Sequence, residues 1–67
     1  MNVLIVGFGV AGKHYFEILK KDKKIKKIYI FDKYRIKKNK HITQIDFNIN
    51  LIKKLNIKFA FVSTPSN

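Results

Sequence analysis

Hydrophobic residues along this chain form short continuous runs separated by segments with a helical spacing. Three runs read as strands buried on both faces, the form typical of a parallel sheet: Asn2–Val6, Lys27–Phe31 and residues 58–63. Between the first two runs, residues 10 to about 21 repeat their apolar positions at a helical interval. The expected apolar face of this helix comprises Ala11, Tyr15, Phe16, Ile18 and Leu19. The pattern predicts an α/β fold with a Rossmann-like parallel sheet, covering about one mononucleotide-binding half.

The polar stretch after the second run predicts no well-formed helix where a complete Rossmann domain often has one. Residues 41–45 predict a short edge strand. Either Asp46 or Asn48 is a suitable cap for a second helix that runs to about Leu55. Asn56 follows as the expected helix stop.

The first strand pattern leads directly into Gly-x-Gly-x-x-Gly, followed by the first helix pattern. In a dinucleotide-binding turn, Gly7 permits the sharp turn and Gly9 leaves room for a diphosphate against the main chain. Gly12 lets the helix lie close to the sheet. The free N–H groups at the start of the helix then face the phosphates. An ordinary glycine-rich turn between a strand and a helix is the alternative.

Asp32 ends the second strand pattern, 20 residues after Gly12. This matches the place of the carboxylate that binds ribose in a dinucleotide fold, roughly 20 residues after the motif. The carboxyl ends of parallel strands lie at one edge of a sheet. The glycine turn, Asp32 with Lys33, and residues 63–67 are therefore expected to converge on one binding site.

The charge is strongly positive, with 15 basic and 4 acidic residues and a formal net charge of +11. Such a balance raises the alternative of a nucleic-acid-binding protein. However, Arg35 is the sole arginine, which favours a lysine-rich solvated surface over a specific nucleic-acid site. Phe31, Phe59 and Phe61 fall in strand patterns and are expected in the core, which leaves no evident stacking platform.

The remaining composition limits the size of the fold and the kinds of chemical site that the chain can contain. With 67 residues, the chain makes at most one small domain, and without cysteine it has no disulfide or thiolate chemistry. His14 and His41 lack the spacing of metal ligands, so no metal site is expected. The sequence contains neither a signal-peptide pattern nor an apolar run long enough to cross a bilayer, which predicts a cytoplasmic protein without membrane partners.

Together, these residues resemble the start of the Gfo/Idh/MocA oxidoreductases. The resemblance rests on the glycine motif continuing into Lys13-His14, on Asp32 after an apolar strand, and on Ser-Thr-Pro-Ser-Asn after the third strand. It covers essentially this whole chain but only the first part of a typical family member. Members of the family are NAD(P)-dependent dehydrogenases that act mostly on sugars, inositols and related polyols.

The resemblance implies a set of cofactor contacts. The glycines would frame the diphosphate, and Asp32 would bind the adenosine ribose while favouring NAD over NADP, a preference that the nearby Lys33 and Arg35 weaken. His14 would be a structural residue of the helix, near the sheet. The residues implied in cofactor binding are Gly7, Phe8, Gly9, Val10, Ala11, Gly12, Asp32, Lys33, Thr64, Pro65 and Asn67.

The family's Glu-Lys-Pro catalytic segment and its substrate domain would lie downstream of this sequence. The chain is therefore expected to be an N-terminal nucleotide-binding segment without catalytic residues of its own, and a small-molecule substrate would require the downstream domain. A non-catalytic nucleotide sensor built on the same half-fold is the alternative function. The last strand pattern is expected to leave an open sheet edge that favours self-association.

Overall fold

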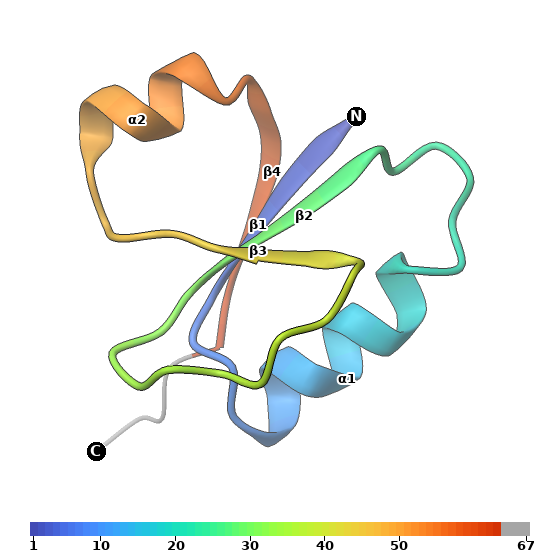
Figure 1. Ribbon diagram of the computed structural model, residues 1–67. Coiled ribbons are helices and arrows are strands. Elements are labelled where there is room, and N and C mark those ends of the chain that lie inside the picture. The colour runs from blue at the N-terminus through green and yellow to red at the C-terminus, as the bar shows by residue number, and fades with distance from the viewer. Residues whose placement is uncertain (64–67) are drawn as a thin grey trace.

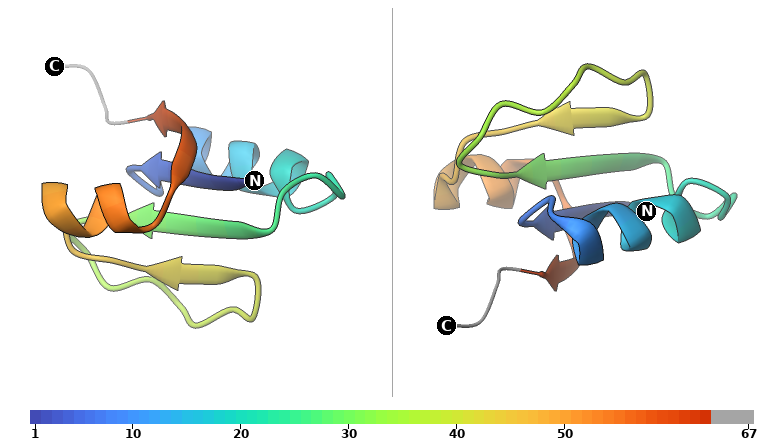
Figure 2. Two further views of the ribbon diagram at one scale, coloured as in Figure 1. Left: turned by 90° about the horizontal axis from the view of Figure 1, so that it is seen from above. Right: turned by 90° about the horizontal axis from the view of Figure 1, so that it is seen from below.

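A computed structural model describes residues 1–63 as a single parallel sheet with two helices (Figure 1). The elements are β1 (Asn2–Val6), α1 (Val10–Leu19), β2 (Lys27–Phe31), β3 (Ile42–Gln44), α2 (Ile49–Lys54) and β4 (Ile57–Val62). The strand order is β3-β2-β1-β4, and all three pairs are parallel. Figure 2 shows α1 and α2 on opposite faces of the sheet. The predicted α/β fold class is confirmed.

β1 is a central strand, paired with β2 on one side and β4 on the other. Its residues Val3 and Ile5 are fully buried, and they lie beside Ile28 and Ile30 of β2. Continuous apolar runs form these two strands because helices cover both faces of the sheet, so neither face requires polar residues. The predicted bounds of β1 and β2 agree with the structure.

α1 packs on the sheet through part of the predicted face, since Phe16 is buried and Tyr15 and Leu19 pack against the core. The other two predicted residues do not contribute, because Ala11 is exposed and Ile18 is 58% exposed. Gly12 is also buried, four residues before Phe16 on the same side of the helix, and allows the close approach to the sheet. The helix also ends at Leu19, two residues before the predicted end.

The core lies between α1 and the sheet. The buried residues of this cluster are Val3, Ile5, Phe16, Ile28 and Ile30, and Leu4 and Tyr29 are buried on the opposite face of the sheet. Aromatic contacts extend it at two points: Phe8 meets Phe16 edge-on at 6.1 Å between ring centroids, and Tyr15 lies 5.2 Å from Phe61 of β4. These contacts attach the glycine turn and β4 to the same helix.

The second helix is short and begins at the Asn48 cap. The Oδ1 atom of Asn48 accepts a hydrogen bond from the Leu51 N–H at 3.1 Å, so Asn48, rather than Asp46, caps α2. Asn56 follows the helix with a φ of 55°, the left-handed conformation that asparagine tolerates at helix ends. Asn2 Nδ2 donates to the Leu55 carbonyl at 2.8 Å, which joins the end of α2 to the start of β1.

β4 forms one edge of the sheet and is more exposed than its sequence suggests. Phe61 is half-buried against α1, but Phe59 is 54% exposed and Val62 is 67% exposed. The prediction that Phe59 belongs to the core is therefore wrong. A strand with a neighbour on one side only cannot bury an apolar residue on a face that no helix covers at that point. The expected open edge at β4 is present.

Candidate functional site

The carboxyl ends of β1, β2 and β4 meet at one edge of the sheet, as parallel pairing requires. Two main-chain hydrogen bonds continue the ladders beyond the strands. The Gly7 N–H donates to the Phe31 carbonyl at 2.7 Å, and the Ser63 N–H donates to the Val6 carbonyl at 2.8 Å. These bonds hold Gly7 beside the end of β2 and Ser63 beside the end of β1, so the ends of all three strands lie next to the glycine turn.

Two of the three motif glycines are required by the local geometry. Gly7 has a φ of 91°, which side chains disfavour. At Gly12, an added Cβ would collide with the Gly7 carbonyl oxygen and lie 2.9 Å from Ser63 Oγ. Ser63 Oγ itself donates to the Gly7 carbonyl at 2.5 Å. The turn is thus closed between the start of α1 and the end of β4.

Gly9 is different, because an added Cβ would meet no atom of residues 1–63 within 4 Å. No local packing explains a glycine here, whereas an open approach to the main chain does. α1 starts at this point without a side-chain cap and without an acidic residue in its first turn. The first intrahelical bond runs from the Lys13 N–H to the Gly9 carbonyl at 2.9 Å, so the N–H groups of Val10 and Ala11 have no acceptor within the helix. Val10 is 90% exposed.

Asp32 lies directly against the glycine turn. Its Oδ2 atom accepts a hydrogen bond from the Phe8 N–H at 2.6 Å, and its Oδ1 atom accepts one from the Tyr34 N–H at 2.9 Å. These bonds, from Tyr34 first and Phe8 second, lower the pKa of Asp32 below its usual range, and the charge of Lys33 adds to the effect. Asp32 is consequently an ionised carboxylate at neutral pH.

A hollow of about 350 Å³ opens beside Asp32, between the ends of β2 and β3. A carboxylate has about four acceptor positions, so two remain on Asp32 for hydroxyl groups. Lys33 lines the same hollow, and its Nζ lies 5.2 Å from the centre of the Tyr34 ring. Arg35 and Asp46 line this hollow as well, so two carboxyl side chains, two cations and an exposed aromatic ring lie at one opening.

Two residues outside the predicted set support this site. Gln44 Nε2 donates to the Tyr34 carbonyl at 2.8 Å, and its Oε1 accepts from the Ile36 N–H at 3.1 Å. This side chain holds the loop that follows Asp32. Ser63 was expected at the converging strand ends, but its bond to Gly7 was not anticipated. No sequence signal identifies Gln44, because β3 is short and also contains the polar residue Thr43.

The histidines do not contribute to the site. His14 is exposed on α1, so the expectation that it lies near the sheet is wrong. His41 is exposed in the loop before β3.

Among residues 1–63, no three His, Cys, Asp or Glu side chains are grouped so that they could hold a metal ion. Neither helix of that region has the length and apolar character needed to cross a bilayer.

The structure brings together Gly7, Phe8, Gly9, Val10, Ala11, Gly12, Asp32 and Lys33 at the carboxyl edge of the sheet. The predicted contacts of Thr64, Pro65 and Asn67 lie outside the described residues.

No protein family, no curated protein and no solved structure gave a match to this chain.

Proposed function

We propose that this chain binds NAD at its glycine turn, as the nucleotide-binding part of an oxidoreductase acting on a sugar, inositol or related polyol. The observation that carries the binding proposal is the position of Asp32, whose Oδ2 atom lies 2.6 Å from the Phe8 nitrogen within the turn. A ribose held by this carboxylate would place its diphosphate at the adjacent start of α1.

The residues present fit a dinucleotide. The uncapped start of α1 offers main-chain N–H groups and the positive end of the helix dipole to a diphosphate. The open space at Gly9 permits close approach of that group. The remaining acceptor positions of Asp32 suit a pair of ribose hydroxyls, whereas a 2′-phosphate would be repelled. The repulsion by Asp32 supports NAD over NADP, and the cations Lys33 and Arg35 in the same hollow reduce this preference.

In this proposal the chain binds and orients the cofactor, which supplies the hydride acceptor when bound. No residue of this chain is assigned to catalysis. The class of substrate rests on the resemblance to the Gfo/Idh/MocA oxidoreductases stated above, through the glycine motif, Asp32 and the segment after Ser63.

Calorimetric titration of the 67-residue chain with NAD and with NADP tests the proposal. We expect saturable binding of NAD that weakens at least about tenfold in Asp32→Ala, because one charge-assisted hydrogen bond contributes about 1.5–3 kcal/mol. Gly9→Val should abolish binding while leaving the fold intact, since the space around Gly9 is open.

Asp22→Ala is the matched control. Asp22 is another carboxylate that accepts a main-chain bond, from the Lys24 N–H at 2.9 Å, but it is exposed and lies in the connection between α1 and β2. Its replacement should leave NAD binding unchanged. An absence of saturable binding, or an equal loss in both aspartate variants, would contradict the proposal.

A further inference from the structure

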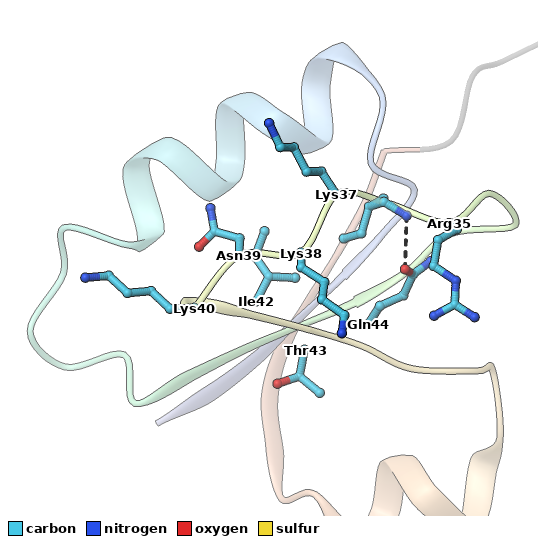
Figure 3. A pocket seen from close by; sticks show the side chains of 9 residues that line it. Arg35, Lys37, Lys38, Asn39, Lys40, Ile42, Thr43 and Gln44 are labelled. Carbon is cyan, nitrogen blue, oxygen red and sulfur yellow. Dashed lines mark hydrogen bonds between the residues drawn. The ribbon is translucent and has the colours of Figure 1, made fainter.

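A second hollow lies between β3 and the loop that precedes it, and it adjoins the hollow beside Asp32 at Arg35 and Gln44. It is open to solvent and has a volume of about 530 Å³. Arg35, Lys37, Lys38 and Lys40 line it, and no carboxylate does. In Figure 3, Lys37 extends toward α1, whereas Lys38 extends to the other side of the loop, beside Gln44. The loop therefore presents cations on both of its sides.

Two smaller hollows adjoin this second hollow and share its lysines. One, of about 250 Å³, includes Lys37 and Lys38 and reaches Lys13 of α1. The other, of about 240 Å³, includes Lys40 and reaches the start of β2. Together they form a continuous basic band, defined here as Lys26, Lys27, Arg35, Lys37, Lys38 and Lys40.

The positive charge of the five lysines in the basic band is not balanced locally, whereas Arg35 also lines the hollow that contains Asp32 and Asp46. Among residues 1–63, Glu17 is the one carboxylate that lines any of the three hollows, and it pairs with Lys20 at 2.9 Å. Within residues 1–63 this is the sole salt bridge. All six band residues are exposed, so their charges face solvent and act together on an anion at this surface.

We propose that the basic band binds single-stranded nucleic acid through its phosphates. Cations that project from both sides of one loop match a flexible phosphate chain that passes over the loop, whereas a rigid surface could contact one side at a time. Lysine contacts of this kind bind phosphates through counterion release and without sequence preference. An open surface without a closed pocket suits a polymer better than a small anion.

An anionic membrane is the less suitable partner. Stable attachment to a bilayer requires apolar side chains that enter the lipid beside the charges. The apolar residues among the three hollows include Ile36 and Ile42, and both are packed against the core. The basic band thus offers charge without an apolar group free to insert.

Fluorescence anisotropy with a labelled 20-nucleotide oligo-dT strand tests the inference over a range of salt concentrations. The test variant replaces Lys37, Lys38 and Lys40 with Gln. The matched control replaces Lys53, Lys54 and Lys58 with Gln. Both variants lower the formal net charge of +11 by the same three units, but the control lysines lie on α2 and β4. Circular dichroism establishes that each variant is folded.

We expect the test variant to lose at least about tenfold in affinity at low salt, and the slope of log K against log salt to fall by about 2, at roughly 0.7 for each cation on a single strand. The control variant should change far less. An equal loss in both variants would show that net charge alone drives binding and would overturn the proposal. Tighter binding to vesicles containing anionic lipid, dependent on the same three lysines, would also overturn it. Neither result depends on NAD binding, because Asp32 is not part of the basic band.

Discussion

The main-chain N–H of Phe8 donates to Asp32 Oδ2 at 2.6 Å and so joins two residues 24 positions apart. The bond fixes the glycine turn after β1 to the end of β2. It also uses one acceptor position of the carboxylate that we propose for ribose binding. The same contact therefore contributes to the stability of the fold and orients the side chain for a ligand.

Asp32→Asn should make the stability of the chain less dependent on acid pH. Because hydrogen bonds lower the pKa of Asp32 in the folded state, its contribution is present above the unfolded pKa of about 3.9 and is lost as pH falls through the folded value. Urea unfolding at several pH values measures this. The wild-type chain should be the more stable above about pH 5, and the difference should shrink below about pH 4. A difference that stays constant down to pH 2 would contradict the assignment.

Gly12→Ala should destabilise the fold far more than Gly9→Ala. The new methyl group at position 12 would collide with the Gly7 carbonyl, whereas at position 9 it would meet no atom of residues 1–63 within 4 Å. Overpacking of this kind costs about 1–3 kcal/mol or more, a large share of the stability of so small a domain. Thermal unfolding of the two variants provides the comparison. Equal melting temperatures would show that α1 does not approach the turn as closely as described.

Gln44→Leu should release the loop that follows Asp32. The side chain makes bonds of 2.8 Å to the Tyr34 carbonyl and 3.1 Å from the Ile36 N–H. Their loss should destabilise the chain by about 1–2 kcal/mol and speed hydrogen exchange at the Tyr34 and Ile36 amides. The neighbouring exposed residue offers a control, since Thr43→Val should leave exchange at both amides unchanged. Unaltered exchange in Gln44→Leu would refute the role of Gln44.

Phe59→Thr and Phe61→Thr should separate solubility from stability on β4. Phe61 lies 5.2 Å from the Tyr15 ring, so its replacement should cost about 2 kcal/mol or more. Phe59 is 54% exposed at the sheet edge. Its replacement should reduce association, measured by light scattering, with little change in melting temperature. Comparable destabilisation by both variants would mean that Phe59 is buried in solution.

Local sequence signals predicted most elements of this fold. Continuous apolar runs predict β1 and β2, because a strand that is covered on both faces has no solvent-facing polar positions to interrupt the run. Gly7 and Asp32 could be placed at the same edge of the sheet by topology alone. The side-chain hydrogen bonds of Ser63 and Gln44 could not be predicted, since their partners are remote in sequence and the bonds exist only after the strands pair.

The errors at α1 and β4 share one physical origin. Apolar spacing identified the helix and its inward residues Tyr15, Phe16 and Leu19, but it also assigned Ala11 and Ile18 to this face, and both are exposed. Likewise Phe59 has the composition of a buried strand residue, yet its burial depends on what lies beside an edge. The spacing of apolar residues depends on the sequence of a single element, whereas the burial of each residue depends on the elements that pack beside it.

The parallel order β3-β2-β1-β4 also has a kinetic consequence, since no two strands are joined by a hairpin. Each pair of strands can form only after the segment that connects them has folded back across the sheet. The pairing of β1 with β4 joins residues as distant in sequence as Asn2 and Ile57. Sheets built from such distant contacts assemble slowly compared with local structures. During synthesis the apolar β1 strand is made first and finds its second partner last, so it is the segment most in need of protection from aggregation before the chain has folded.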